Sequence, residues 1–209
     1  MPRGRSTTRV YGADLETDND GERAWIVQWA ISNGRCEWAG RTLESFKERI
    51  LELMRTGADT YVYFHNLKFD LSYIKYALAD LRDNHDCDLR ITMRERNPIA
   101  LSLIPRDDKR RTVHFRDSLK KFPGATLEQM AKVVGLKKLD GFDFYPGWSE
   151  SVDFDDPANW KYVCMDARIV AVAMQQLHEL GNDRATVSSD AWHAAKRIIR
   201  AGDGSKPGI

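Results

Sequence analysis

Residues 10–18 (VYGADLETD) restrict the fold of this chain most, because two acids interrupt an apolar strand. Residues two apart on a β-strand point to the same face, so Asp14 and Glu16 share one face. If that face is buried, two carboxylates lie together out of water, which is costly unless cations neutralise them. The sequence therefore requires a fold that brings positive charge to this strand.

The composition describes one large domain, with or without a tail. The chain has 209 residues, and its 42% hydrophobic content is enough for a packed core. No apolar run is long enough to span a membrane, and the basic start lacks the apolar segment of a signal peptide. We therefore expect a cytoplasmic protein with no membrane partner.

The near-neutral net charge excludes no class of partner, and the spacing of the cysteines argues against a structural zinc site. The 32 Lys and Arg nearly balance the 31 Asp and Glu, but nucleic-acid binding depends on where the charge lies. Basic residues cluster at 106–111, 119–121 and 136–138, and each cluster is either a solvated turn or a phosphate contact. The three cysteines lack the paired spacing of metal ligands.

Apolar periodicity predicts an α/β fold, with a mixed central sheet flanked by helices. Strands are expected at 10–15, 24–32, 60–64, 89–93, 99–104 and 111–117, with an Asn33-Gly34 hairpin after the second. Helices are expected from the cap Thr42 to Gly57, around 71–81, at 127–134 behind a Thr126/Gln129 capping box, and from Asp156-Pro157 to Gly181. We expect a basic tail at 1–7, a domain at 8–195, and a flexible tail or the start of a further region at 196–209.

Two more acids lie in apolar surroundings. Asp70 follows a predicted strand where a helix begins, and Asp166 interrupts an apolar helix with Tyr162 one turn earlier on the same face. Each acid also has an ordinary interpretation: Asp14 as a strand-end turn residue, Asp70 as a charge at a helix N-terminus, and Asp166 as a partner of Arg168 or a nearby lysine.

Together, the four carboxylates suit two divalent cations about 4 Å apart. Oxygen ligands favour Mg²⁺ or Mn²⁺. Two such ions suit attack of water on a phosphodiester, because one generates hydroxide while the other stabilises the leaving 3′ oxygen. Bound metal would then explain why Asp14 and Glu16 are tolerated together.

Three segments, ADLET (13–17), YFHNLKFD (63–70) and YVCMD (162–166), resemble the exonuclease motifs of family B DNA polymerases. The similarity is closest to the protein-primed branch found in phages with small linear genomes. It covers residues 8–195 and includes 115–145 between the second and third motifs. The resemblance implies a ribonuclease H-like domain that removes mismatched nucleotides from a 3′ end.

The resemblance also assigns roles to the acids. Asp14 would bridge both metals, Glu16 and Asp166 would hold the ion that activates water, and Asp70 would hold the other. Tyr162 would orient the attacking water through its hydroxyl group. Its ordinary alternative is a half-buried aromatic side chain with a solvated tip.

By position, the family's contacts to single-stranded DNA fall on Thr17, Asn66, Phe69, Ser118 and Leu119, with His65 nearby. Aromatic faces stack on bases, while amides and hydroxyls bind sugar and phosphate. Three alternatives remain: Phe69 as core, Ser118 as a cap, and His65 as a hydrogen-bonded residue rather than a metal ligand.

This chain departs from the family pattern at one position, where the family has a lysine. Where the family has Leu-Lys-Gly, with a lysine thought to contact the scissile phosphate, this chain has Asp140. Either Lys138 replaces that catalytic lysine after a small shift, or the contact is absent and Lys137 and Lys138 lie in an exposed loop.

The sequence thus predicts a two-metal 3′–5′ exonuclease that acts on single-stranded DNA ends. Nothing in the chain can carry a polymerase active site, so a separate polymerase region or a priming terminal protein are the further partners implied. The alternatives are a 3′ exonuclease for RNA, and a nucleic-acid-binding or polymerase-docking module without activity. The presence of all four acids and Tyr162 argues against lost activity.

Overall fold

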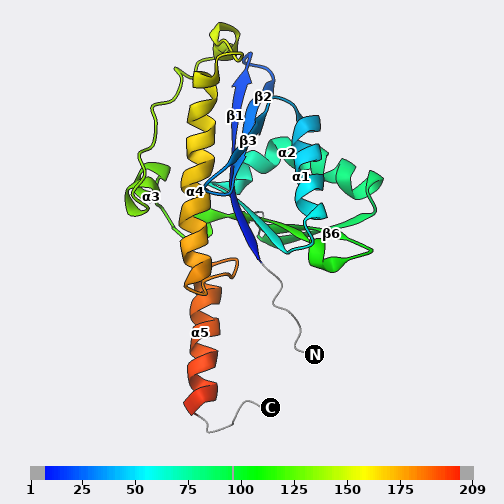
Figure 1. Ribbon diagram of the computed structural model, residues 1–209, viewed down its shortest axis with the longest axis vertical. Coiled ribbons are helices and arrows are strands. Elements are labelled where there is room, and N and C mark those ends of the chain that lie inside the picture. Colours follow the sequence, from blue (N-terminus) through cyan, green and yellow to red (C-terminus); the bar gives the residue numbers. More distant parts are fainter. Residues whose placement is uncertain (1–7, 96, 203–209) are drawn as a thin grey trace.

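The computed structural model describes residues 8–95 and 97–202 (Figure 1). The strands are β1 (Arg9–Asn19), β2 (Ala24–Ser32), β3 (Glu37–Gly40), β4 (Thr60–Phe64), β5 (Cys87–Arg94), β6 (Asn97–Pro105) and β7 (Val113–Asp117). The α-helices are α1 (Leu43–Arg55), α2 (Leu67–Asn84), α3 (Leu127–Val133), α4 (Lys161–Glu179) and α5 (Val187–Gly202). Among the short 3₁₀ helices, η2 (Ser118–Lys120) follows β7, and η4 (Pro157–Trp160) precedes α4.

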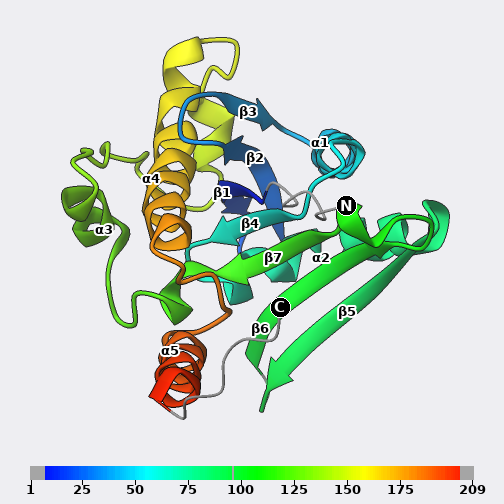
Figure 2. The same cartoon turned by 60° about the horizontal axis from the view of Figure 1, so that its bottom comes forward.

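All seven strands form one mixed sheet in the order β3-β2-β1-β4-β7-β6-β5, which can be followed in Figure 2. The central strands β1, β4 and β7 are parallel, and the outer pairs are antiparallel. Ala13 of β1 pairs with Phe64 of β4, which pairs with Asp117 of β7. Residues just beyond these three positions therefore meet at one edge of the sheet.

Helices cover both faces of the sheet. The larger apolar core joins the sheet to α1 and α2, and a second core joins β1 and β4 to α3 and α4. Figure 1 shows α4 along one side of the sheet and α1 and α2 on the other. This layering places one face of β1 directly beneath α4.

Gly12 allows α4 to lie unusually close to β1. A Cβ atom at this position would lie 2.1 Å from the backbone oxygen of Ala167 and 2.4 Å from the backbone nitrogen of Ala171. Gly12 shares its strand face with Asp14, because the two are two residues apart. The close contact at Gly12 therefore draws the Asp166 region of α4 towards Asp14.

The predicted helix caps are present. The Thr42 side chain accepts a hydrogen bond from the Ser45 backbone, and Thr126 and Gln129 form the predicted capping box. The Asp156-Pro157 start is different: it caps the 3₁₀ turn η4, and the α-helix begins only at Lys161. Proline fits the first turn of either helix type, so this signal could not distinguish them.

Two segments beside the acids, β1 and α2, are longer than predicted. β1 continues to Asn19 because a bulge after Glu16 keeps it paired with β2. α2 begins at Leu67, preceded by Asn66 in the left-handed conformation, and its exposed Lys68 and Phe69 hide the amphipathic pattern there.

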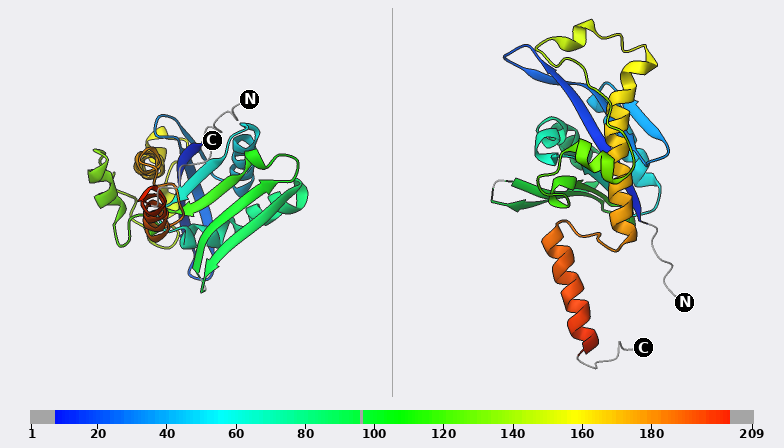
Figure 3. Two further views of the ribbon diagram at one scale, coloured as in Figure 1. Left: turned by 90° about the horizontal axis from the view of Figure 1, so that it is seen from below. Right: turned by 90° about the vertical axis from the view of Figure 1, so that its left-hand side faces the viewer.

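The predicted boundaries at the chain ends stay predictions, and the structure describes these ends only in part. Residues 1–7 and 203–209 lie outside the described residues. Residues 196–202, expected as a flexible tail or the start of a further region, are the end of α5. This helix was not predicted, although Thr186 and Ser189 exchange capping hydrogen bonds at its start. Figure 3 shows α5 extending away from the sheet.

None of the described helices is both long and apolar enough to cross a membrane.

Candidate active site

Three of the four predicted acids meet at the carboxyl edge of the central strands. Asp14 and Glu16 come from β1, and Asp166 reaches them from α4. One carboxylate oxygen from each lies within 4.8 Å of the other two. The same-face spacing on β1 and the close approach at Gly12 together produce this cluster.

Asp70 lies in the first turn of α2 and is buried, but it is outside that group of three among the described residues. Its charge still contributes to the raised pKa of Asp14, and the charge of Glu16 contributes to the raised pKa of Asp70. Asp70 thus lies in the first helical turn, as its ordinary interpretation predicts, but its side chain is buried. It lies beside the cluster without completing the same binding site.

The carboxylates hold their protons unusually tightly. Burial, followed by repulsion from Glu16, Asp166 and Asp70, raises the pKa of Asp14 well above its usual value. Burial and the nearby Asp166 raise the pKa of Glu16 to about 8. Burial also raises the pKa values of Asp70 and Asp166. The cluster therefore lacks sufficient positive charge from the protein alone.

Lys138 provides the only salt bridge to this cluster in the described part of the chain. Its Nζ donates to Asp166 Oδ2 at 2.7 Å and to the Tyr162 hydroxyl at 2.9 Å. Burial disfavours the Lys138 ammonium, but these bonds outweigh that effect and raise its pKa. The exposed-loop interpretation is thus wrong for Lys138, although Lys137 and Asp140 are exposed.

Tyr162 faces the same carboxylates. Burial raises its pKa to about 12, although the bond from Lys138 opposes the change. The phenol is therefore protonated at neutral pH and can donate a hydrogen bond. Asp166 pairs with Lys138 rather than with Arg168, which instead binds Glu37.

The carboxylate oxygens of Asp14, Glu16 and Asp166 suit a divalent cation. Asp166 Oδ1 is buried and has no hydrogen-bond partner among residues 8–95 and 97–202, while its other oxygen accepts from Lys138. A buried carboxylate oxygen without a donor is costly unless a cation occupies its lone pairs. With Asp14 and Glu16 it forms an all-oxygen set of the kind that Mg²⁺ and Mn²⁺ prefer.

Two loops beside the acids hold several of the predicted DNA-contact residues. His65 Nδ1 and Ser118 Oγ are 2.9 Å apart, so His65 is hydrogen-bonded, and Ser118 is fully buried. The Asp117 carboxylate accepts from the backbone nitrogens of Asn66 at 3.2 Å and Leu119 at 3.0 Å. These bonds join the loop after β4 to the turn after β7.

The other predicted contacts differ in exposure. Phe69 is 46% exposed and packs against Tyr73, so its core interpretation is wrong. Asn66 is exposed, and Thr17 and Leu119 are half-buried. Ser118 is not a helix cap, because Asp117 caps η2. An aromatic face and an amide are thus accessible next to the acids.

Sequence reasoning missed three features near this edge. Gln28 is buried in β2 opposite Glu16, and neither of its amide atoms has a hydrogen-bond partner in the residues that the structure describes. Phe144 is 50% exposed, with its ring 6.0 Å from that of Tyr162. Buried Asp18 accepts four hydrogen bonds, which tie the segment around Gly147 and Ser149 to β1. Only the alternation along β1 hinted at Asp18.

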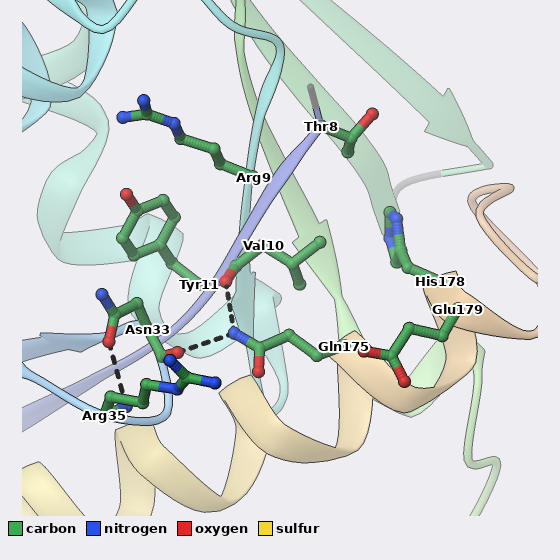
Figure 4. Close-up of a pocket in the computed structure, with 9 residues that line it drawn as sticks. All are labelled: Thr8, Arg9, Val10, Tyr11, Asn33, Arg35, Gln175, His178 and Glu179. Carbon is green, nitrogen blue, oxygen red and sulfur yellow. Dashed lines mark hydrogen bonds between the residues drawn. The ribbon is translucent and has the colours of Figure 1, made fainter. Parts of the chain in front are cut away.

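The basic cluster at 106–111 and a cleft lie away from these acids, whereas Lys138 of the 136–138 cluster belongs to the site. In 106–111, Arg106, Arg110 and Arg111 pair with acids of their own surface. Figure 4 shows a cleft of about 470 Å³ at the amino end of β1, lined in part by Arg9, Arg35 and Gln175. It contains none of the four predicted acids.

Comparisons with known proteins find that the chain is similar to part of phage DNA polymerases. No protein-family model matches the chain. The chain is 28% identical to the DNA polymerase of Bacillus phage phi29 over 215 residues, which cover 95% of this chain and 35% of the polymerase. It is 26% identical to the DNA polymerase of Bacillus phage Nf, over 91% of this chain and 34% of the polymerase. The chain thus spans about a third of the length of these relatives.

Solved structures show the same fold. Phi29 DNA polymerase with primer-template DNA matches 94% of this chain and 36% of its own, with a TM-score of 0.74 and 22% identity. The match to phi29 DNA polymerase complexed with single-stranded DNA covers 92% of this chain and 35% of the polymerase, with a TM-score of 0.72 and 23% identity. These similarities confirm the predicted fold class and the resemblance to phage-type family B polymerases. The chain is therefore a homologue of phi29-type DNA polymerases and shares the fold of about a third of such a polymerase.

Proposed function

We propose that this chain is a metal-dependent 3′–5′ exonuclease that hydrolyses single-stranded DNA ends. The observation that carries the proposal is the convergence of Asp14, Glu16 and Asp166 beside Tyr162 and Lys138. Homology to phage DNA polymerases supports DNA as the substrate. A proofreading role within a longer polymerase follows from the same homology.

Asp14, Glu16 and Asp166 would hold one divalent ion, and Asp70 with Asp14 a second. The ions would activate water and stabilise negative charge on the phosphodiester oxygens. The unpartnered Asp166 Oδ1 and the raised pKa values of the acids support this assignment, because both indicate missing positive charge. Mg²⁺ and Mn²⁺ are the candidate ions.

Tyr162 and Lys138 would act on the reacting groups. Tyr162 stays protonated at neutral pH, so its hydroxyl can orient a water molecule. Lys138 fixes that hydroxyl and the Asp166 carboxylate in one geometry, and its ammonium can offset charge on a phosphate. This assigns Lys138 the place of the lysine missing from the family position.

The 3′ end would lie across the loops joined by Asp117 and by the His65–Ser118 bond. Phe69 would stack on a base, and Asn66, Thr17 and Leu119 would contact sugar or phosphate. Ser118, being buried and bonded to His65, would act through the position of its loop. One matching structure is phi29 DNA polymerase complexed with single-stranded DNA, which supports single-stranded DNA as the ligand.

The wider context is proposed on homology alone. A polymerase region and a priming terminal protein are candidate partners, and the host cytoplasm is the expected location.

The test is degradation of a 5′-labelled single-stranded DNA oligonucleotide with Mg²⁺, with Mn²⁺ and with chelator. We expect a ladder that shortens from the 3′ end and disappears on chelation. The variant Asp14→Ala/Glu16→Ala should lose hydrolysis by on the order of 10³-fold or more while still binding DNA.

Other outcomes would identify the alternatives. Hydrolysis by the double variant at the parent's rate would refute the metal assignment. Equal or faster degradation of a matching RNA oligonucleotide would indicate an RNA nuclease. DNA binding without products at any metal concentration would indicate a binding module.

A further inference from the structure

Gln28 is the most unusual buried polar residue outside the acid cluster. Its side chain is fully buried in β2, and within the described part of the chain neither Oε1 nor Nε2 has a hydrogen-bond partner. Gln175 shows the ordinary alternative: its Nε2 donates to the backbone oxygens of Val10 at 3.0 Å and Asn33 at 2.7 Å (Figure 4). An unpaired buried amide costs roughly 1–3 kcal/mol, so Gln28 calls for a partner.

The sheet register identifies that partner. Gln28 pairs with Glu16 across the antiparallel β1–β2 ladder, just before the bulge between Glu16 and Thr17. Ala30, two residues along β2, pairs with Asp14 and packs against Val163 and Ala167 of α4. Gln28 therefore shares the α4-facing side of the sheet with both acids.

The chemistry of the two side chains is complementary. Directly opposed residues in an antiparallel pair have Cβ atoms about 4.5–5.5 Å apart, which is within reach of an amide and a carboxylate. Carboxylates that ligate metals are generally hydrogen-bonded by outer residues that fix their direction. A glutamine amide supplies such a donor without adding charge to an already acidic site.

We propose that Gln28 is a positioning residue for Glu16, with Nε2 donating to the Glu16 carboxylate when that carboxylate binds a divalent cation. The inference rests on the proposed function, because it concerns a ligand of the proposed metal site. It adds a residue from β2 to a site otherwise built from β1, α2 and α4.

The test measures Mn²⁺ binding to the whole chain by calorimetry without DNA, together with the melting temperature in chelator. Gln28→Met keeps the length of the side chain and removes its hydrogen bonds. We expect Mn²⁺ affinity to fall by about 10-fold or more, while the melting temperature stays equal or rises, because an unpaired amide is removed. Gln28→Leu serves as a second variant.

Gln175→Leu is the control, since it removes a half-buried, hydrogen-bonded glutamine amide at the far end of β1. It should lower the melting temperature and leave Mn²⁺ affinity unchanged. Unaltered Mn²⁺ affinity in both Gln28 variants would overturn this inference and leave the proposed function standing. Equal losses of Mn²⁺ affinity in the Gln28 and Gln175 variants would do the same. A parent chain that binds no Mn²⁺ would instead refute the proposed function, and the inference with it.

Discussion

At the residue scale, the acids that form the candidate site work against the stability of the metal-free fold. Burial and three neighbouring carboxylates raise the pKa of Asp14. A folded pKa above the unfolded value means that ionisation at neutral pH favours the unfolded chain. Stability and the proposed activity therefore place opposite demands on this residue.

Replacing Asp14 with asparagine should separate these two demands. Without metal, Asp14→Asn should raise the free energy of unfolding by about 1–2 kcal/mol, because it removes a buried charge. Exonuclease activity should fall by on the order of 10³-fold. Thermal unfolding in chelator and the oligonucleotide assay measure the two effects, with the exposed-site variant Asp155→Asn as control. A less stable Asp14→Asn protein would contradict the electrostatic argument.

His114 should make the protein sensitive to acid. Burial, with help from Arg116, lowers its pKa to about 4, and the ring stacks on Tyr61 and contacts Ser102. Because the folded pKa lies below the unfolded value of about 6.5, the unfolded chain binds more protons between these values. Stability should therefore fall as pH drops from about 6.5 towards 4, by roughly 1–3 kcal/mol from this residue.

The check on His114 is denaturant unfolding of the parent and His114→Gln across that pH range. The variant should lose less stability on acidification, since glutamine does not titrate. Parallel pH profiles for the two proteins would show that His114 is not responsible.

At the scale of elements, the site depends on how closely α4 lies on β1. Gly12 faces the backbone of α4 at distances that no side chain permits, and the neighbouring α4 residues Ala167 and Ala171 are small. Asp14 lies two residues from Gly12, and Asp166 directly precedes Ala167. Helix position and site geometry are thus set by the same contact.

Adding a single methyl group at Gly12 should disturb both the position of α4 and the geometry of the acid site. Gly12→Ala should lower the free energy of unfolding by about 1–3 kcal/mol through overpacking, and lower Mn²⁺ affinity by moving Asp166 away from β1. Thermal unfolding and calorimetry measure these changes. Gly57→Ala is the control: it has a left-handed backbone and open space, so it should lose stability through strain alone and keep Mn²⁺ affinity. Normal Mn²⁺ binding by folded Gly12→Ala would show that the close contact does not position the acids.

At the scale of the whole molecule, positive and negative charges nearly balance in number but are unevenly distributed over the structure. Lys and Arg number 32 against 31 Asp and Glu, yet four acids gather at one sheet edge with Lys138 as their salt-bridge partner among the described residues. A divalent cation bound there should link elements far apart in sequence, namely β1, α2 and α4. Metal should therefore stabilise the entire fold.

Mn²⁺ at about 100 times its dissociation constant should add roughly 2.7 kcal/mol to the free energy of unfolding, or about 5–10 °C in melting temperature. The double variant Asp14→Asn/Glu16→Gln should show no such shift. An equal shift in the double variant would place the bound ion elsewhere on the molecule.

Local signals predicted much of this architecture. Alternation located β1 and β2, and the Thr126/Gln129 capping box located α3. The start of α2 was missed because exposed Lys68 and Phe69 blur the helical period there. The helix α5 was missed although its sequence is amphipathic at helical spacing. The acids were found because carboxylates within apolar segments are conspicuous in any sequence.

The sequence by itself determined that Asp14 and Glu16 share a strand face and that Asp70 and Asp166 begin or interrupt apolar helices, since these follow from backbone periodicity. Only the tertiary structure decided that Lys138 reaches Asp166 and Tyr162, that Asp70 lies outside the three-acid group, and that Gln28 is buried opposite Glu16 without a partner. Those facts depend on strand register and on how closely α4 packs at Gly12, which are contacts between residues distant in sequence that no local pattern encodes.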